Sequence, residues 1–322
     1  MPSKLSRARC GRNVETDPQS PQARICDVAI VQVKPRKGDY ARNLADIADV
    51  FTQLAADPPD LIVLPESALS GYFLEGAVYD LARTASEFAA DLAAAWKKSG
   101  VPERVDIAAG FYENDAGTYY NSAIYVEVSE RPRILHVHRK MFLPTYGVFD
   151  EERFLSRGRK LSVFETRFGP MAMLICEDIW HSIMPTIAAI KGARCLIVPS
   201  AAPGRGIEAH EENELESVTV WRSLLRNAAS EHGIFLFYAG LTGFEGGKGM
   251  TGSSCVVNPR GEVVVQAPPL GPCILRARVD FKEVDIARAS LPLLGDLSAA
   301  LPDLLLDEEL PLPTRTIDAA GH

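Results

Sequence analysis

The sequence predicts an α/β fold in which mixed β-sheets are covered by helices. Two observations predict it. Strand-like and helix-like segments alternate over the first hundred residues, and short strand-like segments follow one another directly further along the chain. A chain of 322 residues with 47% hydrophobic and 24% charged residues has an ordinary globular composition. We therefore expect one α/β domain with terminal tails.

The first third of the chain has the pattern strand, helix, strand, helix. Residues 28–33 and 61–64 are short apolar runs typical of buried strands. Residues 81–98 are rich in alanine and are followed by a glycine, which favours a helix. A helix with one buried face is expected at residues 39–56, because apolar side chains recur there at helical spacing, at Leu44, Ile47, Phe51 and Leu54.

Strands dominate the middle of the chain. Residues 105–112, 121–128 and 133–138 are three successive strand candidates joined by turn residues, so we expect them to pair with one another. A further apolar run ends at Cys176, and residues 182–192 then have a helical pattern.

The remaining segments return to alternation and then end in strands. Residues 195–199 and 234–239 are expected to be buried strands. Between them, residues 215–232 predict a long helix with Gly233 in the C-cap position. A meander should follow, with strands at residues 254–257, 262–266 and 273–279.

We divide the chain into a flexible N-terminal extension at residues 1–24, one domain at residues 25–300 and a C-terminal tail at residues 301–322. The extension is rich in polar residues and lacks the apolar core of a secretory signal. No stretch reaches the ~18 consecutive apolar residues that a membrane span needs. These features predict a cytoplasmic protein that does not contact a membrane.

Charge and cysteine usage narrow the function further. A net charge of −8 and a pI near 5.4 argue against nucleic acid as a partner, because phosphate binding needs a concentrated basic face. The cysteines contain no C-x-x-C pair and predict neither a metal site nor a disulfide framework. They are scattered through the chain, at Cys10, Cys26, Cys176, Cys195, Cys255 and Cys273.

Cys176 lies where a predicted strand turns into a predicted helix. Such an elbow projects a side chain from the sheet end and leaves backbone N–H groups free to face an oxyanion, which is what a nucleophile needs. The alternative is a buried structural cysteine, since free cysteine is among the most buried residue types. The segment alone does not decide between the two.

Two other segments supply charged residues at predicted strand ends. Glu66 follows the apolar run at residues 61–64, and Lys140 follows the strand at residues 133–138. A thiol needs a nearby base, and Glu66 is the better candidate because the histidines show no Cys-His pattern. We expect structural or surface roles for the three nearby histidines, His136, His138 and His181.

Together, Glu66, Lys140 and Cys176 resemble the Glu-Lys-Cys triad of the nitrilase, or carbon-nitrogen hydrolase, superfamily. The resemblance extends to residues 146–154, 199–201 and 252–262, all in the order that this family shows. It implies an αββα sandwich, usually assembled through homodimers into a longer layered structure. We therefore also expect a homodimer or a higher homo-oligomer.

The resemblance implies a role for each polar residue. Glu66 would take the Cys176 proton and return it to the departing amine, while Lys140 and the backbone N–H of Glu177 would face the oxyanion. Glu151 would orient the lysine and the substrate, and the position of Gly158 seven residues later favours it over Glu152. With a base and a cation beside it, Cys176 is expected to have the lowest pKa among the cysteines.

Four residues are expected to contact the substrate: Tyr72, Tyr146, Glu177 and Trp180. Asp178 would support the elbow together with Trp180, although simple packing is the alternative for Trp180. The aromatic residues that follow the catalytic segments, including Phe73, would shape the acyl pocket or belong to the core.

The Cys-Glu-Asp-x-Trp segment at Cys176 is most similar to the glutamine-amidase domains of NAD synthetases. The sequence has no following Ser-Gly-Gly pyrophosphate loop, so we expect a stand-alone enzyme, and Ala239 stands where many relatives have Asn. The expected reaction is hydrolysis of a small amide through a Cys thioester, without metal or cofactor. Alternatives are an N-carbamoyl amidase, a nitrilase, an acyltransferase, or a non-catalytic, ammonia-delivering subunit of a separate synthetase.

Overall fold

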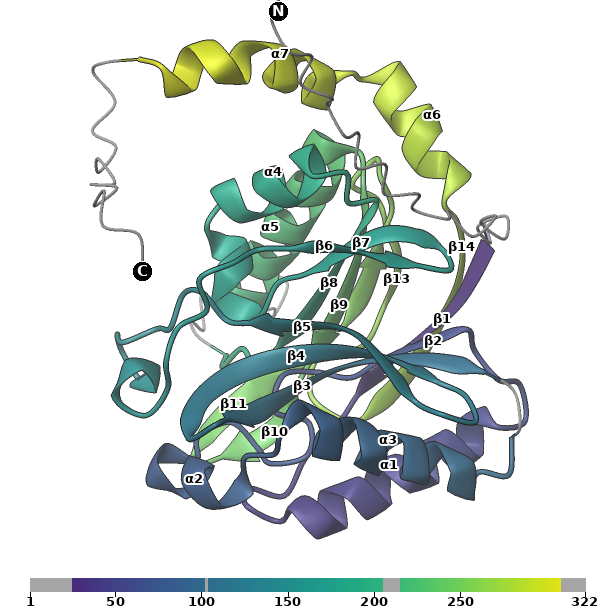
Figure 1. The fold of residues 1–322 in the computed structure, drawn as a ribbon, viewed down its shortest axis with the longest axis vertical. Coiled ribbons are helices and arrows are strands. Elements are labelled where there is room, and N and C mark those ends of the chain that lie inside the picture. The colour runs from purple at the N-terminus through teal and green to yellow at the C-terminus, as the bar shows by residue number, and fades with distance from the viewer. Residues whose placement is uncertain (1–24, 102–103, 205–214, 308–322) are drawn as a thin grey trace, which may run out of the picture.

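A computed structural model describes residues 25–101, 104–204 and 215–307, which form two six-stranded sheets packed face to face (Figure 1). The first sheet has the order β14-β1-β2-β3-β4-β5. Its strands are β1 (Ile25–Gln32), β2 (Leu61–Val63), β3 (Val105–Asp115), β4 (Thr118–Val128), β5 (Arg133–Arg139) and β14 (Cys273–Asp280).

The second sheet has the order β13-β12-β9-β8-β7-β6. Its central strands β7, β8 and β9 are parallel, and antiparallel strands flank them on both sides. The strands are β6 (Val163–Thr166), β7 (Gly169–Met173), β8 (Cys195–Ser200), β9 (Phe235–Gly240), β12 (Cys255–Val257) and β13 (Val263–Gln266). A separate hairpin is formed by β10 (Thr242–Glu245) and β11 (Lys248–Thr251).

Helices cover the outer face of each sheet, so the architecture is an αββα sandwich (Figure 1). The helices are α1 (Tyr40–Leu54), α2 (Val78–Leu81), α3 (Ala85–Lys98), α4 (Ile183–Ile190), α5 (Glu216–His232), α6 (Lys282–Ser290) and α7 (Leu293–Leu305). Three short 3₁₀ turns are η1 (Glu75–Ala77), η2 (Glu151–Arg153) and η3 (Cys176–Trp180).

Alternation along the strands creates two apolar layers. In β1, Val28 and Ile30 point into the core between the sheets, whereas Ala29 and Val31 point toward α1 and α3. This is the period-two pattern of a strand that is buried on both faces. Complete burial of each Val or Ile side chain contributes roughly 1.5–3 kcal/mol, so both layers stabilise the sheet positions.

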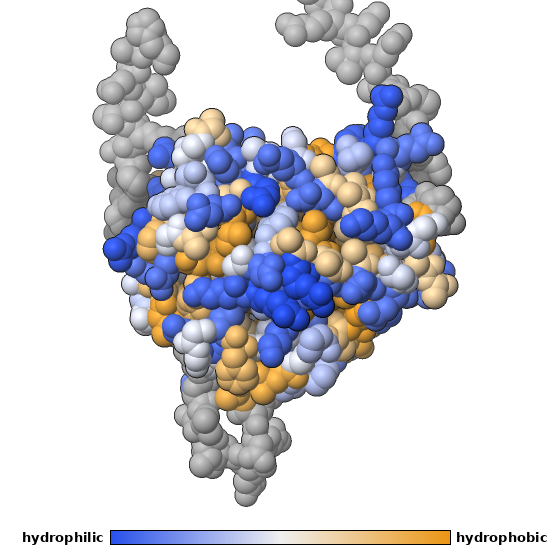
Figure 2. Space-filling view, turned by 90° about the horizontal axis from the view of Figure 1, so that it is seen from below, coloured by the Kyte–Doolittle hydropathy of each residue, from blue (hydrophilic) through white to orange (hydrophobic). Residues whose placement is uncertain are grey.

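Local sequence determines where the covering helices begin and end. Asp39 caps α1 by accepting a hydrogen bond from the Arg42 N–H, and Ile47 and Phe51 on its inner face are buried. The α5 helix ends at Gly233, which takes the left-handed conformation with φ of 57°. Seen from the side of α1 and α3, hydrophilic residues occupy much of the middle of the surface (Figure 2).

Most of the predicted strands and helices are present, with differences that have local causes. The helix expected at residues 81–98 begins only at Ala85, because Thr84 and Glu87 form a capping box there. The strand β6, the β10–β11 hairpin and the last two helices were not predicted. The α7 helix runs across the boundary that we placed at residue 301, and the expected extension at residues 1–24 lies outside the described residues.

No helix within the described residues is long and apolar enough to cross a membrane.

Candidate active site

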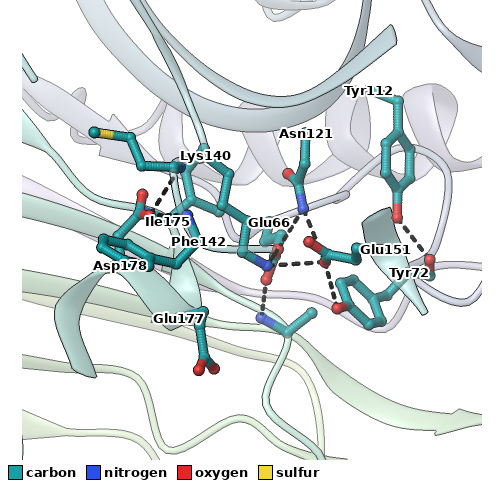
Figure 3. Close-up of polar contacts among 12 residues, drawn as sticks. Glu66, Tyr72, Tyr112, Asn121, Lys140, Phe142, Glu151, Ile175, Glu177 and Asp178 are labelled. Carbon is teal, nitrogen blue, oxygen red and sulfur yellow. Dashed lines mark hydrogen bonds and ion pairs between the residues drawn. The ribbon is translucent and has the colours of Figure 1, made fainter. Parts of the chain in front are cut away.

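The ends of strands from both sheets converge on one buried group of side chains (Figure 3). Glu66 follows β2 and Lys140 follows β5 in the first sheet, whereas Cys176 begins η3 after β7 of the second sheet. Glu151 comes from η2, in the loop that connects the two sheets. The structure thus brings Lys140 into direct contact with both Glu66 and Glu151.

Lys140 is the centre of this cluster and is completely buried. Its Nζ lies 3.0 Å from Glu66 Oε1 and 2.8 Å from Glu151 Oε1. Asn121, from β4, donates from Nδ2 to the same two oxygens at 2.7 and 3.3 Å. A lysine ammonium has three N–H donors, and within the described part of the chain these ion pairs occupy two of them, which leaves one for another acceptor.

Two further contacts fix the carboxylates. The backbone N–H of Ala201, directly after β8, donates to Glu66 Oε2 at 2.7 Å. The Tyr72 hydroxyl donates to Glu151 Oε1 in a short hydrogen bond. Asn121, Ala201 and the Tyr72 hydroxyl contact were not recognised in the sequence. The Ala201 contact uses a backbone group and carries no residue signature, although Pro199-Ser200-Ala201 was part of the family resemblance.

The cluster has strongly shifted proton affinities. Burial lowers the pKa of Lys140, but the charges of Glu151 and Glu66 outweigh burial and hold that pKa well above its ordinary value. Burial raises the pKa of Glu151, against the lowering effect of Lys140. Burial and the Glu151 charge also raise the pKa of Tyr72, so its phenol keeps its proton and remains a donor.

Two glycines permit the chain to approach closely at this point. A Cβ at Gly110, on β3, would lie 2.5 Å from the Glu66 Cα, and a Cβ at Gly158 would lie 2.0 Å from the Arg139 carbonyl oxygen. The Gly158 N–H also donates to the Lys140 carbonyl oxygen at 2.7 Å. Only glycine fits at such approaches, so these residues set the backbone positions of the candidate base and cation.

Cys176 occupies the predicted elbow in a strained conformation. Its φ is 45°, in the left-handed region, which costs a non-glycine residue roughly 1–2 kcal/mol. Asp178 supports the elbow: its Oδ2 accepts from the Ile175 N–H at 3.0 Å, and its Oδ1 accepts from the Met141 N–H at 2.9 Å. Asp178 therefore ties the nucleophile segment to the segment that follows Lys140.

The thiol of Cys176 is not acidic in the resting protein. Burial raises the pKa of Cys176 above its ordinary value and the Glu66 charge adds to this, whereas Lys140 only partly opposes them. The expectation of a low pKa is therefore wrong, because desolvation outweighs the neighbouring cation. A thiolate can form here only if a base accepts the proton during the reaction.

The three histidines have structural contacts. His138 Nε2 lies 2.9 Å from Asp178 Oδ2, and both side chains are fully buried. Burial lowers the pKa of His136 to about 4, so it is neutral at physiological pH. The ring of His181 stacks on that of Phe142, with centroids 3.6 Å apart.

A cavity of about 420 Å³ opens at Cys176. Three of the expected substrate contacts line it: Tyr146, Glu177 and Trp180. The Tyr146 hydroxyl lies 3.0 and 2.9 Å from the two Glu177 carboxylate oxygens, which fixes the acidic side chain at the cavity wall. Trp221 and Glu216, both on α5, also line the cavity and were not predicted, because their helix lies forty residues beyond the nucleophile.

Tyr72 has a different place from the substrate contact that we expected. It lines a separate cavity of about 240 Å³, together with Phe73 and Glu151. Phe149 lines both cavities, so the two cavities are adjacent. Tyr72 thus contacts the catalytic cluster through Glu151 and is not among the residues that line the Cys176 cavity.

Within residues 25–101, 104–204 and 215–307, no group of three or more His, Cys, Asp or Glu side chains could hold a metal ion.

Comparison with known proteins shows the family of this chain. Residues 27–289 match the sequence profile of the carbon-nitrogen hydrolase family. The chain belongs to this family. A carbon-nitrogen hydrolase structure from Helicobacter pylori superposes with a TM-score of 0.77 at 27% identity, covering 88% of this chain and 99% of that one. An amidase from Nesterenkonia sp. AN1, solved with acrylamide, shares the fold with a TM-score of 0.71 at 22% identity, over 89% and 100% of the two chains.

Curated relatives include two kinds of protein. A glutamine-dependent NAD(+) synthetase from Thermotoga maritima is 28% identical over 74% of this chain, which spans only 39% of that protein. A citrullinase from Francisella tularensis is 26% identical over 86% of this chain and 96% of its own length. The similarity to NAD synthetases predicted from the Cys-Glu-Asp-x-Trp segment is therefore confirmed.

Proposed function

We propose that this carbon-nitrogen hydrolase is an amidase that cleaves the C–N bond of a small carboxamide through a thioester on Cys176. The observation that carries the proposal is the single buried cluster in which Lys140 contacts both Glu66 and Glu151, next to an elbow cysteine that lines a cavity. Each component matches one requirement of acyl transfer: a nucleophile, a base and a fixed cation.

In the first half-reaction, Glu66 accepts the thiol proton while Cys176 Sγ bonds to the amide carbon. The remaining N–H of Lys140 and the backbone N–H of Glu177 face the oxyanion. The Glu177 N–H can do so because the N–H groups in the first turn of a helix have no partner within that helix. Glu66 then gives its proton to the nitrogen, the C–N bond breaks, and ammonia or an amine leaves with the thioester in place.

In the second half-reaction, water attacks the thioester and Glu66 accepts a proton from it. The C–S bond breaks, the acid product leaves, and Cys176 regains its proton from Glu66. The raised pKa of Cys176 supports a role for Glu66 as the proton acceptor in both half-reactions, because the thiol then needs a base in order to ionise.

The cavity indicates the chemistry of the acyl group. Among the described residues that line it, Glu177 and Glu216 are acidic and none is Lys or Arg. A negatively charged acyl group would be repelled there, so neutral or cationic amides should be preferred. The likeness to a citrullinase over nearly its whole length favours a second candidate, hydrolysis of a ureido group.

The thioester can be tested by stopping the reaction after its first half. Wild-type protein, Glu66→Gln and Cys176→Ala are mixed with a panel of primary amides, ureido compounds and nitriles, and ammonia release and intact mass are measured. We expect ammonia release over many turnovers by wild type only. Glu66→Gln should slowly gain an acyl mass that maps to the Cys176 peptide, with no more than one ammonia released per protein, and Cys176→Ala should gain none.

Direct attack by water would contradict the proposal. It would appear as labelled oxygen from water in the product of an active amide, with no adduct on wild type or on Glu66→Gln. The panel also separates the candidate reactions, since a ureido substrate that is cleaved far faster than every amide would favour the second candidate.

A further inference from the structure

We propose that Glu245 is a positioning residue for the catalytic cluster, acting through Tyr72. Glu245 ends β10 in the hairpin that projects beyond the second sheet, far from the catalytic residues in sequence. Among the described residues, its hydrogen bonds come from the backbone N–H groups of Tyr72 and Phe73 and not from Lys140. The inference rests on the proposed amide hydrolysis for its effect on rate, and on geometry alone for its effect on Tyr72.

Glu245 holds the end of the segment that follows the candidate base. Its Oε2 accepts hydrogen bonds from two successive backbone N–H groups, those of Tyr72 at 2.8 Å and Phe73 at 3.2 Å. Its Oε1 would lie 3.0 Å from a Cβ at Gly71, where φ is +79°. The carboxylate therefore packs directly against the turn, and the positive φ of residue 71 favours glycine there.

Burying the Glu245 carboxylate to accept from two N–H groups costs desolvation free energy. Glu245 is 5% exposed, and desolvation raises its pKa despite the two N–H donors and the nearby charge of Lys37. Within the described residues, Oε1 has no hydrogen-bond partner. A buried carboxylate oxygen without a partner lowers stability, which indicates that the position of the turn matters more than its stability.

Tyr72 transmits that position to the cluster. Its carbonyl oxygen accepts from the Tyr112 hydroxyl at 2.6 Å, so both backbone polar groups of Tyr72 are held by side chains. The phenol then reaches Glu151 and donates to the oxygen that also accepts from Lys140. The Lys140 Nζ lies 5.7 Å from the centroid of the Tyr72 ring.

Loss of the Glu245 contact would therefore remove the Tyr72 hydroxyl from Glu151 Oε1, the oxygen that it shares with Lys140. Without the phenol, Glu151 Oε1 is left to Lys140 and Asn121, and the ammonium shifts toward Glu151 and away from Glu66. A displacement of about 1 Å in such a constellation costs roughly 10²-fold in rate. Because Glu245 and Tyr72 do not line the Cys176 cavity, this loss should fall on kcat and spare KM.

Two conservative variants separate reach from charge. Glu245→Gln keeps an acceptor at the same reach and loses the charge, whereas Glu245→Asp keeps the charge and retracts the acceptor by one methylene. With the best amide from the panel, we expect kcat of Glu245→Gln within about threefold of wild type. For Glu245→Asp we expect a loss of about 10- to 100-fold in kcat, with KM within about threefold.

Glu113→Gln is the matched control for changing a buried carboxylate. Glu113 is 4% exposed and pairs with Arg139 outside the cluster. We expect it to lower the melting temperature and leave kcat within about twofold. A kcat loss in Glu245→Gln that equals or exceeds that of Glu245→Asp would overturn the proposal, because charge would then matter and reach would not.

A double-mutant cycle with Tyr72→Phe tests the route. If Glu245 acts through the phenol, Glu245→Asp should reduce kcat no further in a Tyr72→Phe background, and additive losses would overturn the proposal. A crystal structure of Glu245→Asp gives a readout independent of activity: the Tyr72 hydroxyl should lie beyond hydrogen-bonding distance of Glu151. An unchanged contact refutes the positioning role, whereas a wild type that hydrolyses no substrate refutes only the proposed function.

Discussion

Arg139 and Lys140 are neighbours in the chain, and each is held by two carboxylates, yet their surroundings differ. Consecutive strand residues point to opposite faces, so the two cations leave the end of β5 in opposite directions. Arg139 pairs with Glu113 through two hydrogen bonds of 2.8 Å and with Asp115 at 2.6 Å, and its side chain is 31% exposed. Lys140 is fully buried.

The difference teaches what a buried cation needs in order to act on a substrate. The planar guanidinium of Arg139 donates to both Glu113 carboxylate oxygens, and its Cζ lies 4.1 Å from the centroid of the Tyr120 ring. These contacts commit the guanidinium to a structural role. Lys140 is a point charge with one donor left over, in surroundings that water does not screen. One cation stabilises the sheet edge, and the other can stabilise a transition state.

The largest expected effect is the contrast between Lys140→Met and Arg139→Met. We expect Lys140→Met to lower kcat/KM on the order of 10³-fold or more, because the oxyanion loses its cation and Glu66 loses its partner. Arg139→Met should stay within about threefold. Steady-state kinetics on the same amide measures both.

Lys140→Met also leaves two buried carboxylates without a cation, which costs about 3–5 kcal/mol of stability. Lys140→Arg keeps the charge and serves as the second variant for this site. It should still lose about 10²-fold or more in kcat/KM, because a planar fork does not fit a site built around a point charge. Wild-type rates in Lys140→Arg would refute the comparison.

Glu151 and Glu152 allow the same comparison, between a buried residue of the cluster and its neighbour outside the cluster, for two carboxylates. They are adjacent in η2, but Glu151 is buried against Lys140 and Glu152 is exposed. We expect Glu151→Gln to lower kcat about 10²-fold, because the amide cannot accept from Lys140 and Tyr72 with the strength of a carboxylate. Glu152→Gln should change kcat less than twofold, and equal losses in both variants would show that the assignment of Glu151 is wrong.

The weak influence of Lys140 on the resting thiol can be measured by alkylation. Cys176 lines a cavity, whereas Cys195 and Cys255 are buried in the core, so iodoacetamide should label Cys176 before those two. Because burial raises the pKa of Cys176, the thiolate fraction should grow about tenfold per pH unit through pH 9 without a plateau. A plateau near neutral pH, read by peptide mass spectrometry, would mean that Lys140 dominates after all.

The smallest effect should appear in the stability of Arg139→Met. The Arg139 side chain is 31% exposed, so water can take its place beside the buried Glu113, and we expect a cost of roughly 1 kcal/mol. Salt screens such a pair, because the Debye length is only about 3 Å at 1 M. Urea unfolding at low salt and at 1 M NaCl should show the difference from wild type shrinking as salt rises. A cost of several kcal/mol that ignores salt would place Arg139 in the same class as Lys140.

The sequence predicted the parts of the site that have a local signature. Glu66 and Lys140 each follow a predicted strand, Cys176 ends an apolar run, and the resemblance to the nitrilase superfamily is what grouped the three residues. The alternating apolar runs and helical stripes likewise predicted most strands and helices. The elbow at Cys176 was predicted because an apolar run changes abruptly into an acidic step.

The remaining parts depend on contacts between residues far apart in the chain. Asn121 looks like the polar start of a strand, and Glu245 looks like a turn carboxylate in a glycine-rich hairpin. The pKa of Cys176 was mispredicted because a list of neighbouring charges says nothing about desolvation, which depends on how both sheets pack around the thiol.

The carboxylate of Glu66 is divided between the two halves of the sandwich. Its Oε1 is held by residues of the first sheet, and its Oε2 accepts from the chain that leaves β8 of the second. The position of the Glu66 carboxylate therefore depends on how the two sheets are aligned. Substitutions that repack the layer between them, even far from Cys176, should alter turnover by sliding one sheet against the other before they unfold the protein.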